Sequence, residues 1–177
     1  HEIDGVPVFT DATRCFAEIP ADVTIDFTNA AWTPVLAQAV LPHGVRMVVG
    51  TTGLPASLMD WLAKESQTRK LGSVVAANFA IGAVLMMHFA QQASRFFDNA
   101  EIIELHHAQK VDAPSGTAKT TADLMLEARR KSFTFPGTEK EIVPGTRGGE
   151  LGGIAIHSVR LPGLVAHQEV IFGGLGQ

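Results

Sequence analysis

The sequence predicts an α/β protein: a partial doubly wound, Rossmann-like parallel sheet followed by an α+β domain with a mixed sheet. Two observations lead to this prediction. Over the first 80 residues, short β-branched runs alternate with helical patterns, as in parallel strands joined by crossover helices. Beyond residue 80 the pattern changes to longer helices and to strands that alternate apolar and polar residues. We therefore expect two domains, over 1–80 and 81–177, with the boundary near residue 80.

The first half contains four short runs typical of buried strands. They span residues 6–9, 23–27, 46–49 and 73–76. Residues 12–19 favour a short helix that would bury Cys15, and apolar residues at helical spacing predict further helices near 35–40 and 54–62. Each strand runs into a loop, and the GTTG segment at 50–53 is one of these loops. Such loops are where an open parallel sheet binds its ligand.

The second half begins with a helix from Ile81. Its expected apolar face carries Ile81, Val84, Leu85, His88 and Phe89, so His88 should pack in the core. A strand over 100–106, a helix over 115–131 and a glycine-rich loop over 136–153 follow. The last two alternating runs, 154–161 and 164–172, are separated by Pro162-Gly163, and we expect them to pair as an antiparallel hairpin.

Composition excludes several classes of partner. Fourteen Lys and Arg residues against eighteen Asp and Glu give a formal net charge of −4, without a basic stripe that would bind nucleic acid. No apolar run approaches the roughly 20 residues of a membrane span, and the opening HEIDGVPVF lacks the pattern of a signal peptide. The single Cys15 cannot form an internal disulfide. A cytoplasmic protein without membrane or nucleic-acid partners is expected.

The candidate site lies where the strand over 100–106 ends. His106, His107 and Lys110 come directly before the run DAPSGT at 112–117, a sequence suited to opening a helix. Unpaired N–H groups and a partial positive charge at a helix start favour a carboxylate. Imidazole or ammonium groups beside that carboxylate could supply a proton during a reaction.

Within this segment, Ser115, Gly116 and Thr117 are the expected carboxylate contacts, and Gly116 would let a ligand approach the backbone closely. Taken alone, a Ser-Gly-Thr helix start is more often a plain N-cap, and adjacent strand histidines point to opposite faces. Because Lys110 lies within ten residues of both features, we prefer a ligand-binding site to a purely structural role. No metal site is expected, because adjacent histidines rarely share an ion and no acidic or thiol ligand has suitable spacing.

The unbroken run HHAQKVDAPSGTA, residues 106–118, closely resembles the substrate-site motif of the dihydrodipicolinate reductase family. Four further segments resemble the family in the same order: IDFT (25–28), VVGTTG (48–53), AANFAIG (76–82) and IHSVR (156–160). The resemblance implies reduction of 4-hydroxy-tetrahydrodipicolinate (dihydrodipicolinate), a small cyclic dicarboxylate, to tetrahydrodipicolinate. It also implies NADH or NADPH as cofactor, a place in lysine and diaminopimelate biosynthesis, and a homotetramer. On this resemblance, residues 1–80 are expected to form a truncated dinucleotide-binding domain and residues 81–177 a substrate-binding and oligomerisation domain.

The resemblance also implies roles for individual residues. His106 matches the acid/base residue of the family, Lys110 the proton donor and His107 a substrate contact, while Gly116 and Thr117 match contacts to a substrate carboxylate. The expected cofactor contacts are Phe27, Thr28, Gly50, Thr51, Thr52, Ala76, Ala77, Asn78 and Phe79.

Two parts of the family pattern are missing from this sequence. The family begins with a glycine-rich strand-to-helix turn that holds the pyrophosphate, and neither this turn nor the family's terminal helix occurs here. The run VAHQE at 165–169 also departs from the usual VGEHT, so no role for His167 follows. Two alternatives stay open: a non-catalytic dicarboxylate-binding fragment or degenerate homologue, and an assembly role for the terminal strands.

Overall fold

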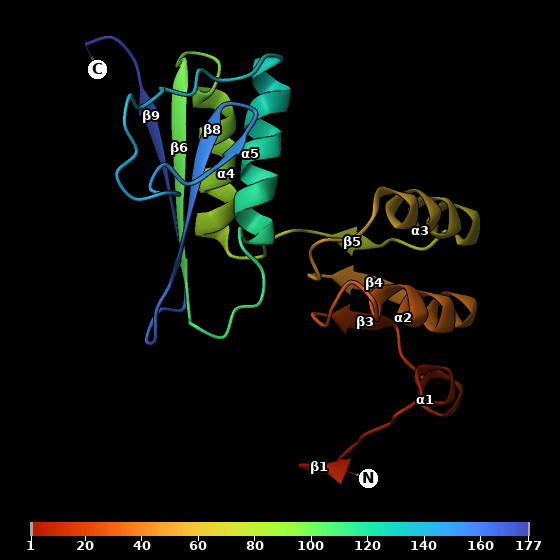
Figure 1. The fold of residues 1–177 in the computed structure, drawn as a ribbon. Helices are drawn as coiled ribbons and strands as arrows, with labels where there is room; N and C mark the ends of the chain where they lie inside the picture. Colours follow the sequence, from red (N-terminus) through yellow and green to blue (C-terminus); the bar gives the residue numbers. More distant parts are fainter. Residues whose placement is uncertain (1, 177) are drawn as a thin grey trace. The chain divides into compact units, whose positions relative to one another are not determined.

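The structure is a computed structural model that describes residues 2–176. The chain divides into two compact units, residues 1–77 and 78–177, and each is described by itself (Figure 1). The α/β class is confirmed, with a parallel sheet in the first unit and a mixed sheet in the second. Over the described residues, no helix has both the length and the apolar character needed to cross a membrane.

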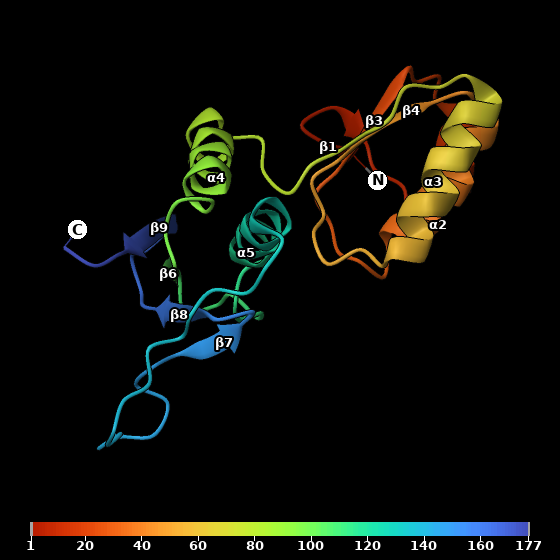
Figure 2. The same cartoon turned by 90° about the horizontal axis from the view of Figure 1, so that it is seen from above.

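The first unit is built on a three-stranded parallel sheet in the order β3-β4-β5. Its elements are β1 (Glu2–Ile3), β2 (Val6–Pro7), α1 (Ala12–Glu18), β3 (Val23–Asp26), α2 (Thr33–Val40), the 3-10 turn η1 (Leu41–His43), β4 (Arg46–Val49), α3 (Ala56–Arg69) and β5 (Val74–Val75). Helices α2 and α3 lie on one face of this sheet (Figure 2). The core between them includes Leu36, Val40, Met47, Val49 and Leu62. This core holds the loops after β3 and β4 at one edge of the sheet.

Two expectations for the start of the chain are wrong. Residues 6–9 do not form a buried strand of the parallel sheet, because β2 pairs with β1 in an exposed antiparallel hairpin. The reason is local: Asp4 and Gly5 both adopt positive φ, 49° and 78°, which turns the chain back at once. In α1 no residue is fully buried, and Cys15 is only half-buried.

The second unit is a four-stranded mixed sheet in the order β7-β8-β6-β9. Its elements are α4 (Ile81–Ala93), β6 (Asn99–His106), α5 (Gly116–Arg129), β7 (Gly149–Leu151), β8 (Ile154–Arg160) and β9 (Ala166–Gly173). Helices α4 and α5 lie together on one face of the sheet (Figures 1 and 2). Alternate residues of the central strand β6, such as Ile102, join Met125, Ile154 and Ile156 in the core. The end of β6 is thereby fixed close to the start of α5.

The expected hairpin between 154–161 and 164–172 is wrong. Strand β8 pairs in parallel with β6, and β9 pairs antiparallel with β6 on its other side, so β6 separates the two runs. The hairpin of this region is instead β7–β8, whose connecting Gly152 and Gly153 both have positive φ, 59° and 84°. A turn signal shows where the chain reverses, but it does not show which strand fills the space beside it.

The expected apolar face of α4 is also wrong. Ile81 is 77% exposed and Phe89 62% exposed, and His88 is exposed rather than packed in the core. The residues that α4 buries are Met87 and Ala90. Nearly every residue from 81 to 90 is apolar, so periodicity could not select the face that packs against the sheet.

Candidate active site

The strand β6 delivers His106 to the site. Side chains alternate along β6, so Glu104 and His106 share the face that carries buried Ile102. Glu104 is completely buried, with 0% of its surface exposed, whereas His106 at the strand end is partly exposed. A carboxylate therefore lies inside the second unit directly behind the imidazole.

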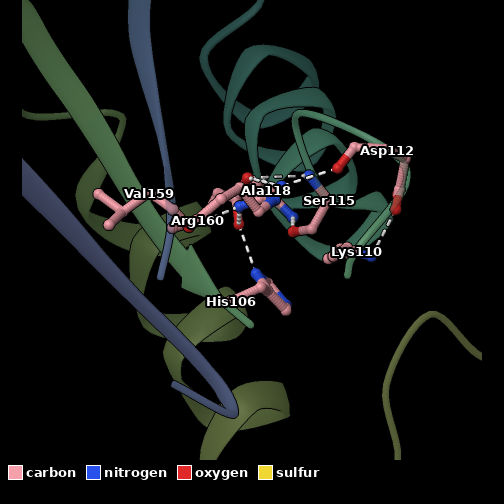
Figure 3. A network of polar contacts seen from close by, with 8 residues as sticks. His106, Lys110, Asp112, Ser115, Ala118, Val159 and Arg160 are labelled. Atoms are coloured by element: carbon pink, nitrogen blue, oxygen red, sulfur yellow. Dashed lines mark hydrogen bonds and ion pairs between the residues drawn. The ribbon is translucent and has the colours of Figure 1, made fainter. Parts of the chain in front are cut away.

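Both oxygens of Glu104 are used. Oε2 lies 2.5 Å from Nδ1 of His106 and accepts from Nη1 of Arg160 at 3.0 Å. Oε1 accepts from Nη2 of Arg160 at 2.7 Å and from the backbone N–H of Ser115 at 3.3 Å. Figure 3 shows His106, Arg160 and Ser115 converging on this network. The Glu104 carboxylate thus connects β6, β8 and the start of α5.

Hydrogen bonding keeps Glu104 ionised. Burial alone would raise its pKa, but hydrogen bonds from Arg160, Ser158 and His106 lower the pKa to about 2. An ionised carboxylate can only accept hydrogen bonds, so Nδ1 of His106 must carry the hydrogen. The other ring nitrogen, Nε2, is then the one left for a substrate.

The helix α5 supplies the second part of the site. Ser115 is its N-cap: the backbone is extended at φ −63° and ψ 151°, and the hydroxyl accepts from the backbone N–H of Ala118 at 3.2 Å. The helix itself begins at Gly116. Its first N–H groups and the positive end of the helix dipole lie beside His106 and favour an anion there.

A cavity of about 480 Å³ in the second unit joins these parts. It is lined by Asn78, Ala80, Gly82, Ala83, Met86, His106, Ser115, Thr117, Ala166, His167 and Gln168. Four of the expected site residues therefore lie around one cavity: Asn78, His106, Ser115 and Thr117. A second cavity of about 630 Å³, beside Pro114 and His157, contains none of the expected site residues.

Three of the expected catalytic and substrate-binding residues lie outside the lining of the 480 Å³ cavity: His107, Lys110 and Gly116. The ammonium of Lys110 forms an ion pair with Oδ1 of Asp112 at 2.6 Å. Burial would raise the pKa of Asp112, but the hydrogen bond from Lys110 holds that pKa below its usual value. His107 is exposed, with Nδ1 3.3 Å from Oε1 of Gln109. Lys110 is thus paired within its own loop.

The expected cofactor residues of the first unit gather around Asp26, which is buried at the end of β3. Its carboxylate accepts from the Thr28 backbone N–H at 3.0 Å and hydroxyl at 2.6 Å, from Thr33 Oγ1 at 2.6 Å and from Thr51 Oγ1 at 3.3 Å. Burial would raise the pKa of Asp26, but these hydrogen bonds lower it. Asp26 therefore ties the loop after β3 to the loop after β4.

Phe27 and Gly50 meet at the same edge. The Gly50 backbone N–H donates to the carbonyl of Asp26 at 2.8 Å, and a Cβ at Gly50 would lie 2.2 Å from Cε1 of Phe27. A side chain at residue 50 would therefore displace the Phe27 ring, which is 62% exposed. Thr52 follows in the same loop.

The remaining expected cofactor residues follow β5. The Ala76 backbone N–H donates to the carbonyl of Val49 at 3.0 Å, and Ala77 ends the first unit. Asn78 and Phe79 belong to the second unit, where Oδ1 of Asn78 accepts from the Ala80 backbone N–H at 2.8 Å just before α4. Within residues 2–176, no group of three or more His, Cys, Asp and Glu residues is arranged to hold a metal ion.

Sequence reasoning missed Glu104, Arg160 and Asp26 as parts of the site. The available signal was a single acidic residue on the apolar face of an expected strand, as at Glu104 in the run EIIELH. A charge in such a position needs a partner, and Arg160 is that partner across the sheet.

The fold defines the class, an α/β protein with a parallel sheet in its first unit and a mixed sheet in its second. The chain belongs to the dihydrodipicolinate reductase family. The family model described as dihydrodipicolinate reductase, N-terminus, matches residues 1–79, and that of the C-terminus matches residues 82–177. The predicted family and its reductase class are confirmed.

Curated relatives carry the name 4-hydroxy-tetrahydrodipicolinate reductase. The protein of Geobacillus kaustophilus is 52% identical over 99% of this chain and 68% of its own length. That of Shouchella clausii is 52% identical over 97% of this chain and 65% of its own length. A solved structure, dipicolinate-bound dihydrodipicolinate reductase from Paenisporosarcina sp. TG-14, matches with a TM-score of 0.77 and 45% identity over 100% of this chain and 67% of that one. The chain spans about two thirds of the length of these relatives.

Proposed function

We propose that this chain carries the substrate site and part of the nucleotide site of a reductase in lysine and diaminopimelate biosynthesis. The reaction is the reduction of 4-hydroxy-tetrahydrodipicolinate to tetrahydrodipicolinate with NADH or NADPH. The observation that carries the proposal is the 480 Å³ cavity, where an oriented imidazole meets the start of a helix. The names of the relatives agree with this reaction.

The start of α5 would bind one substrate carboxylate. Ser115 and Thr117 line the cavity, and Gly116 between them has no side chain to obstruct an approach to the backbone N–H groups. Lys110 would hold a carboxylate as well, once its ammonium exchanges Asp112 for the substrate. A ligand with two carboxylates on a small ring satisfies both groups, and dipicolinate is the ligand named for the related solved structure.

The proton would come from the second unit's own side chains. His106 presents Nε2, since Nδ1 is engaged by Glu104, and the Lys110 ammonium is four residues away in the chain. Hydrogen bonds of catalytic groups are often loose before substrate binds, so the present pairing of Lys110 with Asp112 is compatible with proton donation.

The first unit fits a nicotinamide cofactor. Phe27, Thr28, Gly50, Thr51 and Thr52 follow the carboxyl ends of two adjacent parallel strands, which is where such sheets bind ligands. The Phe27 ring lies against Gly50, and Asp26 accepts hydrogen bonds from both loops. Ala76, Ala77, Asn78 and Phe79 would complete the contacts. The nicotinamide, when bound, supplies the hydride.

A second candidate function is a binding module that takes the dicarboxylate without catalysis. The names of the relatives favour the reductase over this module. Calorimetric titration of this chain with pyridine-2,6-dicarboxylate and, separately, with NADH distinguishes the two. The reductase proposal expects heats of binding for both ligands. Binding of the dicarboxylate alone would favour the module.

We also propose that the protein is a cytoplasmic homotetramer assembled through the sheet of the second unit. The face of β6 opposite the helices carries Ile103 and Leu105, and on β9 Ile171 is exposed on the same side. Apolar positions on an open sheet face are typical of an interface. Multi-angle light scattering would show a fourfold mass, and a monomer would contradict this assembly.

A further inference from the structure

A buried carboxylate behind a catalytic imidazole needs an explanation beyond charge pairing. A structural ion pair would need only Glu104 and Arg160, which form a two-pronged contact at 2.7 and 3.0 Å. Glu104 also bonds the ring of His106, which lines the cavity. Among the charged side chains described in this unit, it is the one that is completely buried. Two of its partners, His106 and Ser115, line the 480 Å³ cavity.

We infer that Glu104 and Arg160 are positioning residues for His106. Glu104 fixes the imidazole in the form with hydrogen on Nδ1, so that Nε2 is offered to the cavity, and Arg160 fixes Glu104. The inference about the ring rests on geometry within the second unit. Its consequence for turnover rests on the proposed reductase function.

The hydrogen bonds of Arg160 extend this arrangement to the neighbouring loop. Besides both oxygens of Glu104, its guanidinium donates to the carbonyl of Asp112 at 2.7 Å and to that of Val159 at 2.8 Å (Figure 3). Asp112 in turn pairs with Lys110. Arg160 thus connects the strand that carries His106 with the loop that carries Lys110.

The backbone N–H of Ser115 makes a further link. It donates to Oε1 of Glu104 at 3.3 Å, one residue before the first turn of α5. The same carboxylate therefore holds the imidazole and the helix start that would bind the substrate carboxylate. A shift of Glu104 would change the distance between proton donor and substrate, and turnover is sensitive to such displacements.

The direct test is the tautomer of His106, read by nitrogen-15 NMR of this chain at about pH 8, where imidazoles are neutral. Unmodified protein should show the Nδ1–H form for His106. In Glu104→Gln the amide can donate to Nδ1, so the Nε2–H form should gain population. Glu101→Gln is the matched control: it lies on the same strand but bonds Arg147 and His157 instead. It should leave the His106 signals unchanged.

Kinetics give the second measurement, on the full-length polypeptide. Glu104→Gln should lower kcat by about 10- to 100-fold, the usual cost of losing an orienting partner, with KM changed by less than about threefold. Glu101→Gln should keep the original kcat. A purely structural role would lower the amount of folded protein but would not produce a change confined to kcat.

Two outcomes would overturn the inference: an Nε2–H tautomer in the unmodified protein, or a Glu104→Gln variant with unchanged tautomer and kcat. If the Glu104→Gln variant does not fold, the Arg160→Lys variant should be measured instead. A single ammonium cannot hold both oxygens, so kcat should fall about threefold or more, and an unchanged kcat would contradict the role of Arg160. If the unmodified enzyme is inactive, the proposed function is refuted. The positioning role of Glu104 is then still decided by the NMR result.

Discussion

At the scale of single residues, Lys110 is paired with Asp112. The side chain of Lys110 is 21% exposed and its ammonium lies 2.6 Å from Asp112, so in the proposed site a substrate carboxylate would compete with a carboxylate of the protein. Partly exposed ion pairs are weak, which makes this competition easy for a ligand with two negative charges. Asp112 therefore holds Lys110 near the site without closing it to substrate.

Replacing Asp112→Asn should strengthen binding of pyridine-2,6-dicarboxylate by about two- to fivefold, because a partly exposed ion pair of up to ~1 kcal/mol no longer has to be broken. Calorimetric titration measures the change. The control is Asp123→Asn, which removes the partner of Lys119 on α5 at a similar distance of 2.7 Å and should leave the affinity as it was. Unchanged or weaker binding by Asp112→Asn would contradict the competition.

Part of the site could be predicted residue by residue and part could not. His106, Ser115 and Thr117 lie within thirteen contiguous residues, and helix-start chemistry explains how they meet. Glu104 and Asp26 were missed because a carboxylate within an apolar strand becomes significant only when its face is known to be buried. Arg160 is 54 residues from His106, and only the pairing of β8 with β6 brings them together.

At the scale of elements, periodicity predicted what each segment is but less well what it contacts. Strands occur near 23–27, 46–49, 73–76 and 100–106, since short β-branched runs between helices favour a parallel sheet. The expectation that the first and third of these are buried is wrong, because Ile25 is 70% and Val74 52% exposed. Pairing of β8 and β9 was wrong because β6 supplies a full-length partner for each. The face of α4 was wrong because the helix is apolar on most of its circumference.

The β7–β8 turn gives a stability prediction. At Gly153, with φ 84°, a Cβ would lie 1.9 Å from the backbone carbonyl oxygen of Phe133, whose own N–H donates to Gly152. Gly153→Ala should lower the free energy of unfolding by about 3 kcal/mol or more, combining backbone strain and a clash. Gly163 is a matched control, with φ 86° but open space, so Gly163→Ala should cost only about 1 kcal/mol of strain. Equal losses in urea unfolding would contradict the clash.

At the scale of the whole molecule, the two units have separate cores. We expect part of the acid sensitivity of the second unit to come from Glu104. Its pKa of about 2 lies below the ordinary 4.5. Because the folded pKa is lowered, the stabilisation is complete above pH 4.5 and is lost as the pH falls towards 2. The loss should reach about 3 kcal/mol at the acid limit.

This loss should be measured by urea unfolding followed by far-UV circular dichroism, because both tryptophans, Trp32 and Trp61, lie in the first unit. Glu104→Gln should be less stable near neutral pH and should lack this part of the pH dependence. A parallel decline of both proteins between those pH values would show that the acid sensitivity arises elsewhere.

In the proposed function, two side chains donate or hold a proton, and removing both is the most direct test. In the full-length polypeptide, oxidation of NADH or NADPH by 4-hydroxy-tetrahydrodipicolinate should be compared for the original enzyme and His106→Ala/Lys110→Ala. We expect kcat to fall by roughly 100-fold to 10,000-fold, as for loss of general acid catalysis, while circular dichroism and the melting temperature stay unchanged. Near-normal turnover by the double variant would contradict the assignment of His106 and Lys110, and with it the proposed site.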